Sequence, residues 1–123
     1  MVEKHAVPLT FLIVRDGEAW VSVACEIYVG SQGSTVDEAR EMLKEALEIN
    51  VSSAVELGQA EDLGSPIPAE DLAELLEVPR EQVVVEYHTM LLNVETEPGP
   101  HLVSMEFLRS PVTPIGCQLS AAA

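Results

Sequence analysis

The sequence predicts an α+β domain, and three patterns in it support this prediction. Two apolar, β-rich runs flank the pair Asp16-Gly17, a dipeptide that favours a tight hairpin turn. A long stretch with helical periodicity follows the hairpin, and further strands return after a short second helix. The 123 residues are expected to form one domain (1–123) with a β-rich C-terminal extension at about residues 79–118.

The two opening strands are expected at residues 8–15 and 19–29. Because successive side chains of a strand point to opposite faces, the second run divides into two sets. The set expected to face the core is Val21, Val23, Cys25 and Ile27. The set expected to face solvent or a partner is Trp20, Ser22, Ala24 and Glu26. Two glycines within residues 30–33 then interrupt the strand pattern.

A capping box marks the beginning of the long helix. Thr35 is followed three residues later by Glu38, so the helix should begin at about Val36. Gly58 is a typical stop. The apolar side of this helix is expected to consist of Val36, Ala39, Met42, Leu43, Ala46, Leu47, Val51 and Ala54. Asn50 lies near the middle of this stripe, and we expect it to be buried and hydrogen-bonded.

The second half of the chain is predicted to contain a short helix and two strands. The helix should span residues 69–76 and end before Pro79. The strands should span residues 82–95 and 101–108, with a turn at Pro98-Gly99-Pro100 between them. The residues from 111 onward are expected to form an irregular tail, because they contain Pro111, Pro114 and Gly116.

The charge balance is strongly acidic. Six Lys and Arg residues stand against 21 Asp and Glu residues, which gives a formal net charge of −15 at pH 7. Nucleic acid is not expected as a ligand, because binding it requires clustered cations and these six are dispersed along the sequence. An acidic surface suits a cationic protein or a metal ion, or it serves only as a solvated coat.

Membrane and secretory signals are not recognised in the sequence. No apolar run approaches the roughly 18 residues that a membrane-spanning helix needs, and the N-terminus does not resemble a signal peptide. Cys25 and Cys117 lie far apart and do not form a zinc-binding spacing. We therefore expect a cytoplasmic protein with reduced thiols and no membrane association.

A metal-dependent phosphodiesterase is one alternative function. It requires several acids around a divalent cation, and the candidates are Asp16, Glu18, Glu26, Asp37 and Glu38. The hairpin turn accounts for Asp16 and Glu18, however, and the helix cap accounts for Glu38. No metal-binding or catalytic pattern includes the three histidines His5, His88 and His101. We therefore expect no enzyme, no catalytic residue, no metal ion and no cofactor.

A transcriptional regulator is the other alternative, because residues 69–88 resemble a degenerate helix-turn-helix. Ala73, Leu76 and Val78 occupy positions suited to packing between two helices. The second helix would offer few side chains able to read base edges, however. The three consecutive valines that begin at Val83 also favour a strand.

The order of motifs over about residues 9–57 resembles that of the HicB-like antitoxin family. Two strands lead to Cys25-Glu26-Ile27, a Gly-Ser-Thr turn leads to Val36-Asp37-Glu38-Ala39, and a helix with Glu45-Ala46-Leu47 follows. The resemblance implies a partial ribonuclease H-like ββ(β)α core without catalytic acids of its own. It also implies a non-catalytic protein that binds and neutralises a small basic ribonuclease toxin of the HicA-like kind, or an orphan homolog of such antitoxins.

The second strand and the residues just beyond it supply the candidate partner-binding residues, which are Trp20, Glu26 and Tyr28. An aromatic side chain beside a carboxylate is a combination found at binding hot spots. The alternative for Trp20 is that it packs under the C-terminal segment. We also expect a homo-oligomer, most simply a homodimer, because this strand face and residues 82–94 present more apolar surface than one helix can cover.

Overall fold

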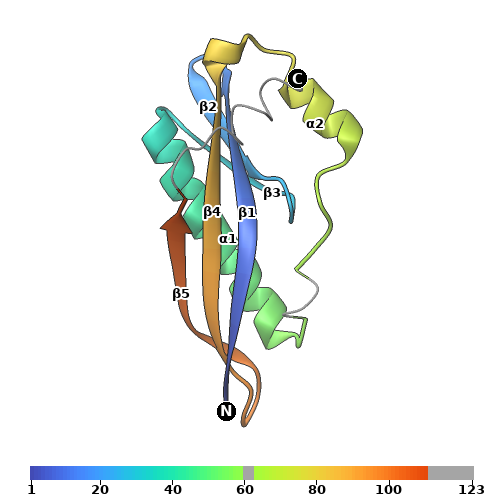
Figure 1. Ribbon diagram of the computed structural model, residues 1–123, viewed down its shortest axis with the longest axis vertical. Helices are drawn as coiled ribbons and strands as arrows, with labels where there is room; N and C mark the ends of the chain where they lie inside the picture. The colour runs from blue at the N-terminus through green and yellow to red at the C-terminus, as the bar shows by residue number, and fades with distance from the viewer. Residues whose placement is uncertain (60–62, 111–123) are drawn as a thin grey trace.

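The computed structural model describes residues 1–59 and 63–110. Its elements, in chain order, are β1 (Val2–Asp16), β2 (Ala19–Ala24), β3 (Val29–Gly33), α1 (Val36–Glu56), α2 (Ala69–Leu75), a 3₁₀ turn (Arg80–Gln82), β4 (Val83–Glu95) and β5 (His101–Arg109). Figure 1 shows α1 crossing the sheet formed by the strands. The predicted α+β class is confirmed, with its long helix, its short second helix and its C-terminal strands.

The five strands form one antiparallel sheet in the order β3-β2-β1-β4-β5. The central strand is β1, whose Val14 lies opposite Val21 of β2 and Val83 of β4. It begins at Val2, earlier than its apolar run indicates, because residues 2–7 pair with the end of β4. Both β4 and β5 are therefore integral parts of the sheet.

The strand pattern does not predict β3, because glycines dominate it. It nevertheless pairs with β2, from Val29 opposite Ala24 to Gly33 opposite Trp20. A Cβ atom at Gly33 would lie only 2.5 Å from the backbone nitrogen of Ala39 in α1. Glycine is thus required where β3 passes close to the start of the helix, and the segment continues the sheet instead of ending it.

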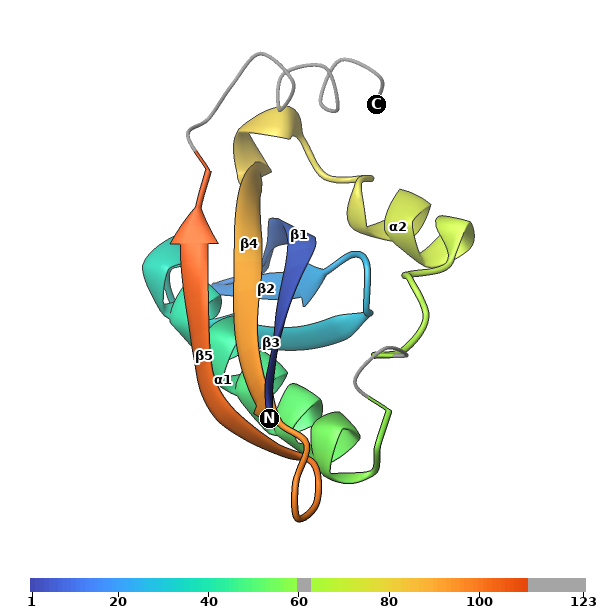
Figure 2. The same ribbon diagram turned by 60° about the horizontal axis from the view of Figure 1, so that its bottom comes forward.

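Two apolar clusters cover opposite faces of the sheet. The larger cluster lies between α1 and the sheet and includes Phe11 and Leu43. The smaller cluster lies on the opposite face, where Leu12 and Val23 pack with Ile67 and partly buried residues of α2. Figure 2 shows the sheet curling around α1, with α2 on the other side of β1.

Because both faces of the sheet are covered, the predicted orientation of the β2 side chains is wrong. Ser22 and Ala24, expected to face outward, are 0% exposed. They face α1, where the hydroxyl of Ser22 donates a hydrogen bond of 2.8 Å to the carbonyl oxygen of Ala39. Val23 is buried as expected, but against α2 on the other face. The alternation itself is present, and the assumption of a single covered face was wrong.

The predicted start of α1 is confirmed, but two of its residues lie elsewhere than expected. Thr35 accepts a hydrogen bond of 3.0 Å from the backbone nitrogen of Glu38, as the capping box predicts. Asn50, expected to be buried, is exposed, and Met42 is 40% exposed. The fully buried residues of α1 are spaced four apart: Ala39, Leu43, Leu47, Val51 and Val55. The covered stripe is therefore narrower than the apolar pattern suggests.

The expected short helix and C-terminal strands correspond to α2, β4 and β5, close to their predicted ranges. The expected irregular tail and Cys117 fall on residues 111–123, outside the described residues. Among the residues that are described, no helix combines the length and the apolar character needed to cross a bilayer.

Candidate functional site

The three predicted partner-binding residues do not form one patch. Trp20 lies near the start of β2, between Arg15 of β1 and Gly33 of β3, and is half-buried. The guanidinium carbon of Arg15 lies 5.9 Å from the centroid of its ring. Glu26 and Tyr28 lie beyond the other end of β2, at least about 13 Å away, because each strand residue adds about 3.3 Å.

Glu26 and Tyr28 both hold the turn between β2 and β3 in place. The Glu26 carboxylate accepts hydrogen bonds from the backbone nitrogen and the hydroxyl of Thr10, at 2.6 and 2.8 Å. Tyr28 adopts φ +44°, which is rare outside glycine, and its hydroxyl donates to Asp71 of α2 at 2.8 Å. This hydrogen bond raises the pKa of the phenol. A role of these residues in partner binding stays a prediction.

The acids considered for a metal site are only partly brought together. Three of them line a hollow of about 450 Å³ beside the start of α1: Asp16, Glu18 and Glu38. Glu26 is held in its turn by Thr10, and Asp37 pairs with Arg40 at 2.7 Å. Within residues 1–59 and 63–110, no three His, Cys, Asp or Glu side chains lie close enough to hold a metal ion.

Cys25 has no features of a reactive thiol. It lies just after β2 and is partly buried. Burial, with a smaller effect of the neighbouring Glu26 charge, raises the pKa of its thiol to about 11. Because the thiolate is the nucleophilic form, this side chain is inert at neutral pH.

Residues 69–88 do not form the two helices of a helix-turn-helix. The first helix is present as α2, but residues 80–82 form only a single turn. Val83 then begins β4, which is paired with β1 along its whole length. A strand held inside a sheet cannot enter the major groove as a recognition helix does.

A buried ionic network joins α1, β4 and β5. The Glu86 carboxylate accepts hydrogen bonds from Nε and Nη2 of Arg40, at 2.7 and 2.5 Å. Nη2 of Arg109 lies 3.1 Å from the same carboxylate, and Nε2 of His88 lies 2.9 Å from it. The His88 ring is stacked on Phe11, with 4.0 Å between the ring centroids. Three separate elements are therefore tied to one carboxylate.

Glu86 is ionised in this network. Burial acts to raise its pKa, but the hydrogen bonds from Arg40 and His88, with the charges of Arg40 and Arg109, hold the pKa at about 2. Because a carboxylate only accepts hydrogen bonds, Nε2 of His88 must carry a proton. The side chains of Glu86 and His88 are each 1% exposed, so no substrate can reach them. The network is suited to holding elements together and not to catalysis.

The sequence contains part of the signal for this network. Alternate residues of β4 share its covered face, and they are Glu86, His88, Met90, Leu92 and Val94. The alternation alone therefore places an acid and a histidine among core residues. Their partners Arg40 and Arg109 could not be assigned, because each lies on a different element whose position depends on the whole fold.

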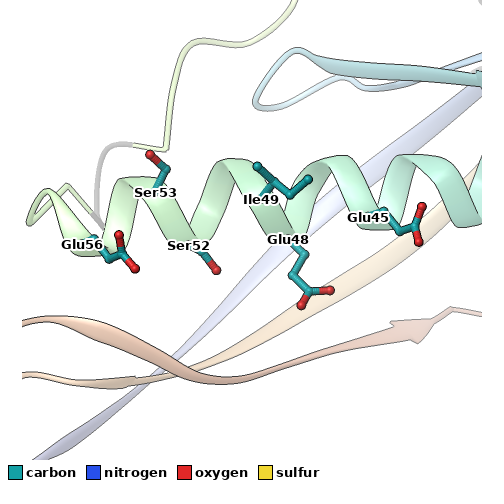
Figure 3. A pocket seen from close by; sticks show the side chains of 6 residues that line it. All are labelled: Glu45, Glu48, Ile49, Ser52, Ser53 and Glu56. Carbon is teal, nitrogen blue, oxygen red and sulfur yellow. The ribbon is translucent and has the colours of Figure 1, made fainter.

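The outer side of α1 has the composition of a binding surface. Ile49 is 73% exposed and Leu57, which caps the helix, is 70% exposed. A hollow of about 650 Å³ lies along the helix, lined by six residues that we call the α1 outer face: Glu45, Glu48, Ile49, Ser52, Ser53 and Glu56. Figure 3 shows Ile49 near the middle of this row, between the first two glutamates and the two serines.

The charges of the α1 outer face are not balanced within the helix. From Glu45 to its end, α1 contains three glutamates and neither Lys nor Arg. The two basic residues of the helix, Arg40 and Lys44, already pair with carboxylates of the same chain. Glu45 and Glu48 lie one turn apart and repel each other. Glu56 lies in the last turn, where the helix dipole disfavours negative charge. A cationic group of another molecule would reduce both the repulsion between Glu45 and Glu48 and the unfavourable interaction of Glu56 with the helix dipole.

Comparison with known proteins adds no assignment to these surfaces. The chain matches no protein-family model, no curated protein and no solved structure. The resemblance to HicB-like antitoxins, with the likeness to ribonuclease H that it implies, therefore stays a prediction from residues 9–57.

Proposed function

We propose that this chain is a non-catalytic interaction protein whose α1 outer face binds a small basic protein. The observation that carries the proposal is the exposed side chain of Ile49, set among three carboxylates on a single helix. Exposed apolar surface with a polar rim marks interaction sites on soluble proteins.

The apolar and acidic parts of the α1 outer face have different roles in this proposal. The apolar part supplies contact area that becomes dry in the complex. The carboxylates attract a cationic partner from a distance, aided by the net charge of −15. A basic partner is therefore favoured over a neutral or an acidic one.

The resemblance of residues 9–57 supports the same kind of partner. HicB-like antitoxins neutralise a small basic ribonuclease toxin by binding it, so a HicA-like toxin is the partner that we propose first. An orphan homolog would lack such a toxin. A cytoplasmic location belongs to the same proposal, because the free thiol of Cys25 suits a reducing compartment.

The test measures a defined complex. The tagged chain is purified from its native host, the co-purifying basic protein is identified, and its affinity for the purified chain is measured by biolayer interferometry. Ile49→Ala should raise the Kd at least about tenfold, because the central apolar contact is lost. Glu48→Lys should mainly slow association at about 50 mM NaCl and lose most of this effect at about 500 mM.

Two control variants make the same chemical changes on the opposite side of the sheet. Val2→Ala shortens an exposed apolar side chain on β1, and Glu70→Lys reverses an exposed charge on α2. Both should leave the Kd within about twofold, well below the tenfold step that about 1.4 kcal/mol produces. The proposal is wrong if no basic protein binds, or if Ile49→Ala has no larger effect than Val2→Ala.

A further inference from the structure

Part of the sheet is covered by neither helix. On the face opposite α1, the α2 cluster reaches Leu12 and Val85 but not the residues nearer the start of β1. There, β1, β4 and β5 present a surface that we call the open sheet face, formed by Ala6, Pro8, Thr89, Leu91 and Leu108. Ala6, Pro8 and Leu108 are exposed, whereas Thr89 and Leu91 are half-buried by their neighbours in the sheet.

The register of the strands defines this face. Its two rows across β1, β4 and β5 are Pro8, Thr89, Leu108 and then Ala6, Leu91, Glu106. The residues that alternate with them, including Leu9, Met90 and Phe107, pack in the cluster under α1. The two rows therefore point away from α1.

The open sheet face contrasts in charge with the rest of this acidic chain. Its charged neighbours are Lys4 on β1 and Glu106 on β5, with β4 between them. Within the described residues, neither forms an ion pair. Two further carboxylates lie at the margin. Glu95 is paired with the amino group of Met1 at 2.5 Å, and Glu26 accepts a hydrogen bond of 2.8 Å from the hydroxyl of Thr10. The face thus presents one positive and one negative group on either side of an uncharged centre.

We propose that the open sheet face is the interface of a homodimer, in which a second copy packs face to face about a two-fold axis parallel to β4. This axis places β1 over the β5 strand of the other copy. Lys4 then faces the row of Ser104, and the partner subunit's Glu106 lies two residues, about 7 Å, further along the strand. The two-fold axis repeats this pair of charges. A two-fold axis across the strands would instead stack β1 on β1 and bring like charges together. Sheets packed face to face lie about 10 Å apart, a gap that Lys and Glu side chains bridge together.

A second copy fits this distribution of charge better than a cationic partner does. Two chains of charge −15 repel each other unless their acidic surfaces are kept apart. Packing through the open sheet face leaves the α1 outer faces on the two far sides of the dimer. A cationic protein would meet the ammonium group of Lys4 here, whereas a second copy supplies the carboxylate of Glu106 to it. The proposed dimer is independent of the function proposed above.

The size of the face indicates a weak dimer. Three strands about 4.8 Å apart, each contributing about six residues of about 3.4 Å, give a few hundred Å² per copy. Stable complexes bury about 800 Å² per partner. We therefore expect a Kd in the micromolar range.

A charge exchange tests the proposed axis. Sedimentation equilibrium of the full chain measures the Kd of self-association for the natural sequence, Lys4→Glu, Glu106→Lys and the double variant. Each single change should raise the Kd at least about tenfold, although Glu106→Lys lowers the net negative charge of the chain. The double variant restores both pairs and should return the Kd to within about threefold of the natural value.

The matched control is Glu70→Lys, which makes the same change of charge on exposed α2. It should leave the Kd unchanged or lower it, because it only reduces the overall repulsion. Circular dichroism confirms that each variant is folded. A chain that stays monomeric at about 1 mM, well above the micromolar range, overturns the proposal. Failure of the double variant to restore association also overturns it, as does dimerisation that appears only after removal of residues 111–123.

Discussion

At the scale of single residues, Glu86 and Arg40 show how a charge is kept inside an otherwise apolar helix–sheet contact. The carboxylate is surrounded by donors from three elements, so its burial is compensated by hydrogen bonds. Replacing such a pair by apolar residues of similar volume can be neutral, whereas removing one partner alone is costly. The loss in free energy of unfolding after replacing one donor therefore measures how much that donor compensates the burial of Glu86.

Arg40→Met should lower the free energy of unfolding at pH 7 by about 3 kcal/mol, because Glu86 loses its main donor. The ordinary pKa of Glu86 is 4.5, and the folded protein holds it at about 2. A carboxyl group with a lowered pKa contributes stability above its ordinary pKa and loses it as the pH falls through the folded value. The difference in free energy of unfolding between Arg40→Met and the natural sequence should therefore decrease as the pH falls from 4.5 to 2. Urea denaturation at several pH values measures this difference.

Lys44→Met is the matched control for this prediction. Lys44 lies one turn further along α1 and pairs with the exposed Glu41 at 3.2 Å. Lys44 is itself half-buried, and its ammonium group lies 5.8 Å from the centroid of the Phe107 ring. Because Glu41 is exposed and the cation–π contact is at its distance limit, we expect Lys44→Met to cost only about 1 kcal/mol. Equal losses of stability in the two variants would contradict the role given to the buried network.

At the scale of secondary-structure elements, local signals predict which segments fold into helices and strands. The Asp16-Gly17 turn and the Thr35 cap are defined by neighbouring residues, and the structure contains both. The faces of β2 could not be predicted in the same way, because they depend on where α1 and α2 lie. The sequence does not predict β3 for a related reason: Gly33 is needed for contact with a helix that comes later in the chain.

Gly33→Ala should lower the free energy of unfolding by at least about 2 kcal/mol, because overpacking of a close contact forces the backbone to move. The added Cβ would lie 2.5 Å from the nitrogen of Ala39 and 2.8 Å from the carbonyl carbon of Glu38. Gly99→Ala is the control, since a Cβ there meets nothing within 4 Å. It should be neutral or slightly stabilising. Similar urea midpoints for the two variants would contradict the close approach of β3 to α1.

At the scale of the whole molecule, the sequence predicts an acidic interaction protein but not the position of its binding surface. Net charge is a sum over the chain and needs no structure. The alternation of one strand predicts Trp20 and Glu26 as binding residues, and Tyr28 follows just beyond it. In the structure, Trp20 lies near the start of β2, and the other two lie past its end. The sequence does not indicate Ile49, because an apolar residue on an apolar-rich helix resembles a core residue until the position of the covered stripe is known.

The same charges should act in opposite directions on stability and on binding. The last turn of α1 is a poor place for a carboxylate, so Glu56→Gln should raise the free energy of unfolding by about 0.3 to 0.5 kcal/mol. It should also weaken binding of the basic partner about two- to threefold at low salt, because one attractive charge is lost.

Glu70→Gln makes the same change in the first turn of α2, where negative charge is favoured. It should slightly lower stability and leave binding unchanged. Urea denaturation and interferometry measure both quantities, and a parallel change in the two variants would show that Glu56 does not belong to the binding surface.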